Sequence, residues 1–300
     1  MATTTTTTAS VPDHDFLLAL AQTDAFTPLP ATSLEAVLSS PPFVPVPGTF
    51  NARDLGLVPG SPIRPGRLYR TGVFSSSASS PPSSSTADSR SELEPGLGLG
   101  VGRMFDLRTA GERARRPEPV VDGVEAVWIA PDEGGEAAPR LKDFEEGEGE
   151  KGVARMYLDV MRLYRRGIKR LLEQVGEGWD RGALLFHCNA GRDRTGVVAA
   201  ILLSLAGASG ETIALDYMLS RIGIEPAKDQ LLAYVTKGPM AASLDSPGFK
   251  NMANLRVSCW EAFVKAVDAE YGGFEGYVRA TLGFSEEEVA KIKNNLVLPN

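Results

Sequence analysis

Short apolar runs and stretches of helical periodicity alternate along the chain. Residues 103–107, 126–130 and 183–186 have the length and composition of buried β-strands, and two more short strands are expected within residues 43–72. Helices are expected at residues 13–23, 34–38, 156–175, 195–206, 210–220, 254–269 and, after the capping box of Ser285 and Glu288, up to residue 296. This order predicts an α/β fold with a central, mostly parallel sheet flanked by helices, and extra helices at the C-terminus.

Three polar segments interrupt this pattern. Residues 1–12 carry a threonine run and are predicted to be a disordered tail. Residues 75–91 are nearly all serine, proline and alanine, which predicts a disordered insertion in a loop. Residues 133–152 are rich in glycine and acidic residues and are expected to be solvated. Residues 13–300 are therefore interpreted as a single domain that carries one insertion.

Composition narrows the function classes. A chain of 300 residues that is 43% hydrophobic can bury one sizeable core. Its net charge of −7 and its lack of a long basic run argue against nucleic-acid binding. The apolar run at residues 197–205 is far too short to span a bilayer, so no stable membrane insertion is expected. Two cysteines form no disulfide framework and no signal peptide is evident, which favours a cytoplasmic location.

The most informative segment is His-Cys-Asn-Ala-Gly-Arg-Asp-Arg-Thr-Gly at residues 187–196. Five residues separate Cys188 from Arg194, Gly191 allows a tight turn between them, and an apolar helix follows. A strand, a tight loop and a helix N-terminus direct the backbone N–H groups of residues 189–194 into one concavity, which is an anion site.

A cysteine at the floor of such a site points to covalent phosphoryl transfer. The thiolate is the nucleophilic form, and helix N-termini and nearby cations favour it. The planar guanidinium of Arg194 can hold two oxygens of a tetrahedral anion. Thr195 can either donate its hydroxyl to the Cys188 sulfur or serve as a helix N-cap. Together these residues predict a phosphocysteine intermediate.

The cysteine has two other interpretations. Cys188 could be a buried structural residue that ends a core strand, but packing alone does not require the polar residues around it. A metal site at His187 and Cys188 is not expected, because neighbouring strand residues point in opposite directions and no other Cys/His pair exists. Neither a metal nor another cofactor is predicted.

The loop resembles the signature of the cysteine-dependent protein tyrosine and dual-specificity phosphatases. More narrowly, Arg192 and Asp193 before the loop arginine resemble the tyrosine/serine phosphatases of bacteria and fungi. Three other segments resemble motifs of that branch: Asn-Ala-Arg-Asp-Leu-Gly at 51–56, Leu-Tyr-Arg-Thr-Gly at 68–72, and Asp-Leu-Arg-Thr at 106–109 with Glu112 and Arg113 after it. Residues 271–277 and 282–285 resemble its closing helices, so the likeness extends from about residue 40 to the end.

The resemblance implies a phosphatase-like sheet and a role for each site residue. Cys188 would be the nucleophile and Arg194 the clamp on the phosphoryl oxygens. Substrate would be bound by Asn189, Ala190, Gly191 and Arg192, with Asp106 shaping the floor of the site, Arg108 anchoring a neighbouring loop and His187 orienting the phosphate loop. The proton donor for the leaving group is either Asp193, within the loop, or Asp132, after a strand; Asp193 is slightly preferred.

The expected activity is hydrolysis of phosphotyrosine in protein substrates, extending to phosphoserine and phosphothreonine. Arg192 leaves a second substrate class open, because another cation beside the cradle would suit the extra phosphate of a phosphoinositide; alternatively, Arg192 faces solvent. A non-catalytic phosphate-binding interaction module is the third interpretation. Such a module would be expected to lack the nucleophile or the arginine, and this chain has both Cys188 and Arg194.

Overall fold

The computed structural model describes residues 13–46, 48–73, 98–132, 135, 138–236 and 244–297. The predicted tail at 1–12 and the predicted insertion at 75–91 both lie outside these residues. Five strands form one sheet in the order β1-β2-β5-β3-β4, and only β1 runs antiparallel to its neighbour. Their bounds are β1 Arg53–Asp54, β2 Leu68–Thr71, β3 Val101–Asp106, β4 Glu125–Trp128 and β5 Ala183–His187. This confirms the predicted α/β fold with a mostly parallel sheet.

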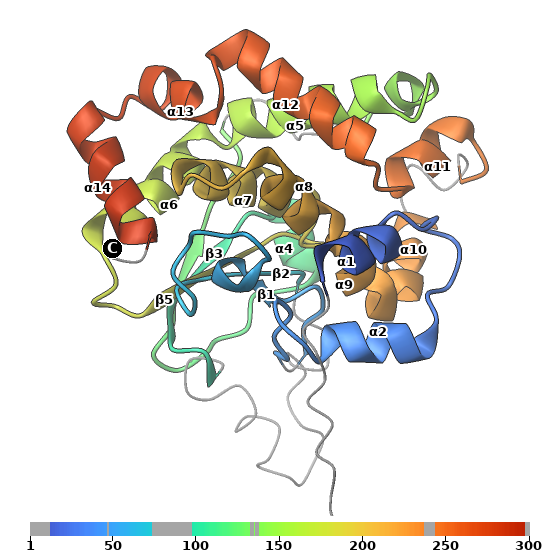
Figure 1. The fold of residues 1–300 in the computed structure, drawn as a ribbon, viewed down its shortest axis with the longest axis horizontal. Coiled ribbons are helices and arrows are strands. Elements are labelled where there is room, and N and C mark those ends of the chain that lie inside the picture. Colours follow the sequence, from blue (N-terminus) through green and yellow to red (C-terminus); the bar gives the residue numbers. More distant parts are fainter. Residues whose placement is uncertain are drawn as a thin grey trace, which may run out of the picture.

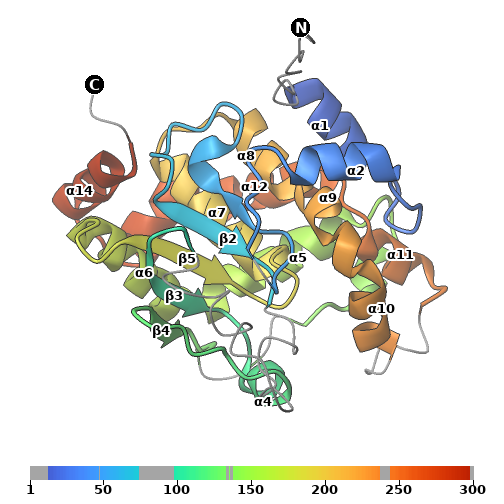
Figure 2. The same cartoon turned by 90° about the horizontal axis from the view of Figure 1, so that it is seen from below.

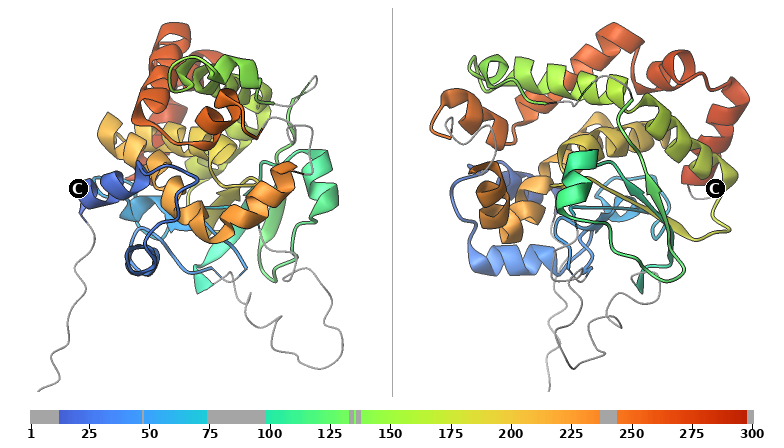
Figure 3. Two further views of the ribbon diagram at one scale, coloured as in Figure 1. Left: turned by 90° about the vertical axis from the view of Figure 1, so that its right-hand side faces the viewer. Right: turned by 180° about the vertical axis from the view of Figure 1, so that it is seen from behind.

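Most helices gather on one face of the sheet (Figure 1). Those on this face are α5 (Glu150–Leu163), α6 (Arg165–Glu177), α7 (Asp193–Leu205), α8 (Gly210–Met218), α12 (Val257–Tyr271), α13 (Phe274–Gly276) and α14 (Glu286–Leu296). A second group lies beside the sheet (Figure 3): α1 (His14–Ala21), α2 (Ala31–Leu38), α9 (Ser220–Ile224), α10 (Lys228–Thr236) and α11 (Pro247–Ala253). The short helix α4 (Ala110–Arg115) follows β3. None of the helices in the described part of the chain is long and apolar enough to cross a membrane.

The central strand β5 is buried on both faces. Leu184 and Phe186 belong to the main core beneath the helices, whereas Ala183 and Leu185 belong to a smaller apolar cluster on the opposite face. This alternation follows from the two-residue repeat of a strand. Both faces and both edges of β5 are packed, and this packing holds the residues at its carboxyl end in place.

The helix predicted at 156–175 is two helices, which corrects that prediction. The break falls at the buried residue Tyr164, whose φ of −113° departs from helical geometry. The backbone N–H of Asp132 donates to Leu163 O at 2.5 Å, so a group from outside the helix takes a carbonyl next to the break. Such an insertion is a common cause of a helix break.

The acidic segment at 133–152 is not solvated throughout, which corrects a second prediction. Residues 141–144 form a short 3₁₀ turn, and Phe144 is fully buried. A side chain at Gly152 would collide with the Phe144 ring, since a Cβ there would lie 2.4 Å from it. Helix α5 begins at Glu150, which is six residues earlier than the start that the apolar periodicity indicated.

Candidate active site

Cys188 follows the last residue of β5, at the carboxyl edge of the sheet (Figure 2). Its side chain is buried. β5 lies between β2 and β3, and His187 is in register with Thr71 on one side and Asp106 on the other. The loop after Cys188 leads directly into α7, which begins at Asp193. The predicted arrangement of strand, tight loop and helix N-terminus is therefore present.

Side chains from two distant segments hold the carbonyl groups of the loop. Asn51 Nδ2 donates to Ala190 O at 3.1 Å and to Gly191 O at 3.0 Å, and Arg70 Nη2 donates to Gly191 O at 2.7 Å. In a trans peptide the N–H points opposite to the preceding carbonyl. With these carbonyls held on the outside, the following amides are directed to the inner side of the loop.

The amides of residues 189–192 meet no competing acceptor among the described residues. In the described part of the chain, no backbone or side-chain group accepts a hydrogen bond from the amides of residues 189–192. The first amides of α7 have no acceptor within the helix either. A row of unsatisfied N–H groups around a buried cysteine is well suited to bind a phosphate.

Gly191 is required by the shape of the loop. Its φ is +65°, in the left-handed region that favours glycine, and a Cβ there would lie 2.4 Å from Thr71 O. Asn51 also has a positive φ, +59°, which asparagine tolerates better than most residues. The loop and the segment that holds it therefore depend on residues suited to this backbone geometry.

A buried ion-pair cluster supports the residues that hold the loop. Arg53 Nε donates to Asp216 Oδ1 at 2.8 Å, and Arg70 pairs with the other oxygen of the same carboxylate. Burial alone would raise the pKa of Asp216, but the two arginines outweigh burial and the pKa is lowered. Sequence reasoning missed Asp216. Its one signal there is an acidic residue in the apolar run Ile-Ala-Leu-Asp-Tyr-Met of α8.

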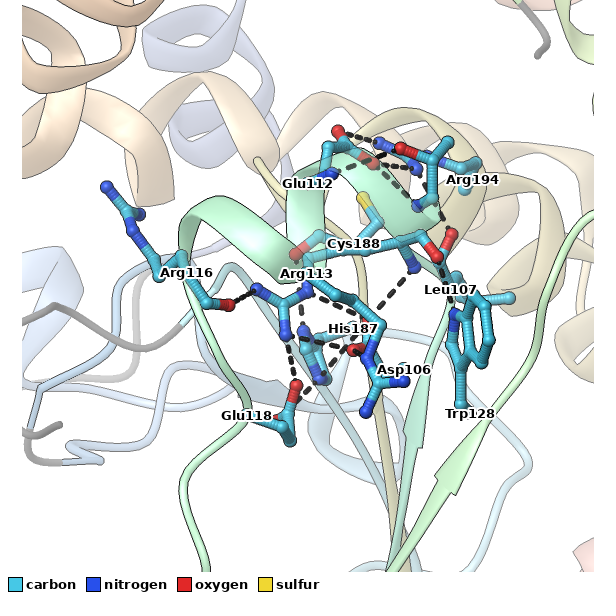
Figure 4. A network of polar contacts seen from close by, with 12 residues as sticks. Asp106, Leu107, Glu112, Arg113, Arg116, Glu118, Trp128, His187, Cys188 and Arg194 are labelled. Carbon is cyan, nitrogen blue, oxygen red and sulfur yellow. Dashed lines mark hydrogen bonds and ion pairs between the residues drawn. The ribbon is translucent and has the colours of Figure 1, made fainter.

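Arg194 is held by Glu112, a second residue to which sequence reasoning gave no role (Figure 4). Arg194 Nη1 donates to Glu112 Oε2 at 2.6 Å and to Leu107 O at 3.1 Å, and Nη2 donates to Glu112 Oε1 at 2.8 Å. Glu112 is placed by the capping box of α4, in which Thr109 and Glu112 bond to each other's backbone N–H. Burial tends to raise the pKa of Glu112, but Arg194 outweighs it and the pKa is lowered.

These contacts orient the guanidinium without using all of it. A guanidinium carries five N–H donors, and Glu112 with Leu107 engages three of them. The Nε–H and the second Nη2–H lie on another edge, which can bind a phosphate through two parallel hydrogen bonds. Tyr164, at the break between α5 and α6, lies beside Arg194 and Cys188, and its burial raises the pKa of its hydroxyl.

The alternative in which Arg192 faces solvent is wrong. Its Nη1 donates to Ala253 O at 3.0 Å and its Nη2 to Met252 O at 3.1 Å, at the end of α11. Its Nε donates to Asp193 Oδ1 at 3.0 Å. Burial would lower the pKa of Arg192, but Asp193 outweighs it and the pKa is raised. Arg192 therefore ties the phosphate loop to α11.

Asp193 is fixed through one carboxylate oxygen. Oδ1 accepts hydrogen bonds from Arg192 Nε and from the Tyr157 hydroxyl at 2.7 Å, and the Tyr157 hydroxyl lies 2.8 Å from that of Tyr217. Both tyrosines are buried, which raises the pKa of each hydroxyl and keeps them protonated. None of these contacts involves Oδ2.

Asp132, the other candidate acid, lies against the start of α6. Its carboxylate is 3.3 Å from Arg166 Nε and 3.9 Å from Arg165 Nε. Its backbone N–H donates to Leu163 O, as described above. These contacts connect Asp132 to the helix break, and its ion-pair partners come from α6 and not from the phosphate loop.

Asp106, Glu118 and His187 lie together below Cys188 (Figure 4), and Arg108 joins them in a buried network. Arg108 donates to both oxygens of Asp106 at 2.9 Å and also pairs with Glu118. His187 Nε2 lies 3.0 Å from Glu118 Oε1, while its Nδ1 lies 3.3 Å from Cys188 O. Burial tends to raise the pKa of Asp106, but His187 and Arg108 outweigh it and the pKa is lowered. The network is thus linked to the backbone of Cys188.

Ligand atoms of Asp106, Glu118 and His187 lie within 4.8 Å of one another, a spacing that a metal ion could use. The guanidinium of Arg108 is bound to the same two carboxylates, however, and supplies the positive charge that they require. This cluster is therefore better explained as an ion-pair network than as a metal centre.

Thr195 lies within the first turn of α7 and is fully buried. Its hydroxyl has no hydrogen-bond partner within the described part of the chain, and none joins it to the Cys188 sulfur in this structure. A buried hydroxyl without a partner is costly. Donation by Thr195 to the sulfur stays a prediction. The alternative that Thr195 is the helix N-cap is wrong, because the N-cap of α7 is Arg192.

Comparisons with known proteins agree with this geometry. Residues 44–298 match the model of the tyrosine phosphatase family. A candidate tyrosine-protein phosphatase of Cupriavidus necator is 30% identical over 254 residues, covering 82% of this chain and 85% of that protein. A tyrosine-protein phosphatase of Nostoc commune is 30% identical over 203 residues, covering 66% of this chain and 67% of that protein.

A third relative is named for a broader activity. The triple specificity protein phosphatase PtpB of Mycobacterium tuberculosis is 27% identical over 283 residues, covering 84% of this chain and 98% of that protein. The family match alone spans most of the chain. The protein therefore belongs to the tyrosine phosphatase family, whose members are phosphoric monoester hydrolases.

Proposed function

We propose that this protein hydrolyses phosphotyrosine in protein substrates, and phosphoserine and phosphothreonine as well, through a phosphocysteine on Cys188. The observation that carries the proposal is the loop itself. Asn51 and Arg70 hold its carbonyls outward, the amides of residues 189–192 have no acceptor among the described residues, and the buried Cys188 begins the loop. Donors fixed before the reaction stabilise the charge that develops on the phosphoryl oxygens in the transition state.

In the first step, Cys188 Sγ attacks phosphorus and the bond from phosphorus to the substrate oxygen breaks. The leaving oxygen takes a proton from the general acid, while Arg194 and the loop amides hold the other three phosphoryl oxygens. In the second step, water attacks the phosphocysteine and gives a proton to the same carboxylate. Inorganic phosphate leaves, and the Cys188 thiolate is regenerated.

We assign the general acid to Asp193 in preference to Asp132. Asp193 directly follows the phosphate loop as the first residue of α7, and two donors fix its Oδ1 without using Oδ2. The ion-pair partners of Asp132 are Arg165 and Arg166, which lie on α6 and not in the phosphate loop. In this assignment Asp106 and Arg108 act below the loop and shape it, without touching substrate.

Protein substrates are favoured over phosphoinositides by the position of Arg192. The extra phosphate of a phosphoinositide would need a cation beside the cradle. Each nitrogen of the Arg192 guanidinium already donates to a protein acceptor, at Asp193, Ala253 and Met252. Binding a second phosphate there would compete with the tie between the loop and α11.

The proposal is tested by assaying wild type and Cys188→Ser on a phosphotyrosine peptide, a phosphoserine peptide and a soluble phosphoinositide. We expect wild type to turn over the phosphotyrosine peptide most efficiently and Cys188→Ser to have no measurable activity on any of the three. Retained turnover in Cys188→Ser would overturn the phosphocysteine mechanism. A preference of wild type for the phosphoinositide would overturn the substrate assignment.

A further inference from the structure

A pocket of about 230 Å³ adjoins the phosphate loop. One wall is formed by the loop residues Asn189, Ala190, Arg192 and Asp193. The opposite walls come from α9–α11 and from the segment between α1 and α2, which lie beside the carboxyl ends of β2 and β5 (Figure 2). The pocket therefore shares four residues with the loop in which the phosphate is proposed to bind.

The walls away from the loop are mostly apolar. Their large side chains are Phe26, Ile224, Leu231, Leu232, Phe249 and Met252. Phe249 is buried, but Phe26 at the rim is 40% exposed and the two leucines are half-buried. Aromatic and aliphatic surface left open beside a catalytic loop is the usual lining of a ligand pocket.

The charged residues that line the pocket are already paired. Glu225 accepts hydrogen bonds from Lys228 at 3.0 Å and from Arg221 at 2.5 Å. Arg221 also donates to three backbone carbonyls of the segment between α1 and α2. Arg192 is committed as described above. An occupant would therefore gain most from apolar contact, and little from charge.

We propose that this pocket is a specificity subsite for a large apolar side chain, aromatic or aliphatic, that flanks the phosphorylated residue of a peptide substrate. The inference rests on the proposed function, because the subsite acts only when the phosphate lies in the loop. A dry cavity of about 150 Å³ already holds a benzene ring, so the pocket has room for one leucine, phenylalanine or methionine side chain.

A peptide side chain is favoured over the acyl chain of a lipid. The pocket accommodates one such side chain, whereas a long acyl chain would extend well beyond it. The net charge of −7 also opposes approach to an anionic membrane surface. A flanking apolar residue on a soluble phosphopeptide meets neither obstacle.

The test uses phosphotyrosine peptides that differ only in one residue beside the phosphotyrosine, which is either leucine or alanine. We expect leucine at one flanking position to raise kcat/KM of wild type roughly tenfold or more. In Leu231→Gln and Leu232→Gln the ratio between the two peptides should fall toward one. Phe16→Ala, at a 45% exposed position on α1 outside the pocket lining, should keep the wild-type ratio. Thermal unfolding of each variant is measured to check that the fold is retained.

The outcomes separate this inference from the proposed function. Turnover of a small aryl phosphate by wild type, but with the same kcat/KM for leucine and alanine peptides at every flanking position, would overturn the subsite alone. Failure of wild type to hydrolyse the aryl phosphate and every peptide would overturn the proposed function. A third outcome would be a higher kcat/KM of wild type for a short-chain phosphoinositide than for its free headgroup, with this difference lost in Leu231→Gln. That outcome would overturn the assignment of a peptide side chain as the occupant of the pocket.

Discussion

Glu112 binds Arg194 through two hydrogen bonds, from Nη1 to Oε2 at 2.6 Å and from Nη2 to Oε1 at 2.8 Å. The clamp is thereby oriented before substrate arrives. Glu112→Gln keeps the size of the side chain but replaces one acceptor by a donor that faces the guanidinium. Since small misplacements of a catalytic group cost about 100-fold in rate, we expect kcat on a phosphotyrosine peptide to fall about 10–100-fold.

The same chemical change at Glu286 is the matched control. Glu286 pairs with Arg279 at the start of α14, where its side chain is 80% exposed. Glu286→Gln should have the wild-type kcat. Equal values of kcat for the two variants would mean that Glu112 does not position Arg194.

A Cβ at Gly191 should disrupt both the fold and the site. Gly191→Ala would place a methyl group 2.4 Å from Thr71 O on a backbone with a φ of +65°. We expect a loss of about 1–3 kcal/mol in the free energy of unfolding and loss of most activity. Gly210→Ala is the control, because a Cβ there meets nothing within 4 Å and α8 begins at this residue.

Gly210→Ala should stabilise the protein by about 0.4–1 kcal/mol. Denaturant unfolding of both variants, with kcat/KM on one phosphopeptide, checks the pair. Equal stability of the two variants would contradict the close approach of the loop to β2.

The pair of His187 and Glu118 should make stability depend on pH. Burial alone would lower the pKa of His187, but the carboxylates of Glu118 and Asp106 outweigh burial and the neighbouring Arg108, so the pKa is raised above 6.5. A histidine with a raised pKa in the folded state stabilises the protein fully below its unfolded pKa. This stabilisation is lost as pH rises through the folded pKa.

Glu118→Gln removes the main charge that holds this proton. Wild type should therefore have a higher free energy of unfolding than Glu118→Gln, and the difference should be largest below pH 6.5. This difference should shrink as pH rises through the pKa of folded His187. Unfolding curves of both proteins across this range measure the margin. A margin that is constant or that grows with pH contradicts the ion pair.

The general acid can be assigned by leaving groups of different acidity. With Asp193→Asn, we expect kcat to fall roughly 10²–10⁴-fold for the aryl phosphate with the least acidic phenol, and much less for the most acidic one. Any effect of Asp132→Asn should be similar across the series, because the carboxylate of this residue pairs with Arg165 and Arg166 on α6. If the loss of kcat depended steeply on the acidity of the leaving phenol in Asp132→Asn and not in Asp193→Asn, the assignment would be reversed.

Local patterns in the sequence were enough to place the central strand, the loop and α7. The run at 183–186 is continuously apolar because β5 is buried on both faces, and the spacing from Cys188 to Arg194 reflects the tight turn at Gly191. The capping box predicted the last helix correctly. The same signal at Thr109 and Glu112 could have identified α4 and with it the residue that holds Arg194.

Contacts between distant segments could not be read in the same way. Asp216 reaches Arg53 and Arg70 from α8, and no periodicity records that approach. Continuous apolar spacing also hid the break at Tyr164, because the bond beside it, from the Asp132 N–H to Leu163 O, comes from a distant segment. The partners of Arg192 on α11 could not be predicted from the sequence either, because they are backbone carbonyls, which every residue type carries.

The central claim is that Cys188 carries the phosphoryl group between the two steps. The most direct measurement is rapid acid quench of wild type during turnover of a phosphotyrosine peptide, followed by mass spectrometry of the fragment that contains Cys188. The account predicts phosphate on Cys188 within the first turnover, and none in Cys188→Ser. Full turnover with no phosphate on Cys188 at any quench time, together with activity in Cys188→Ser, would contradict it.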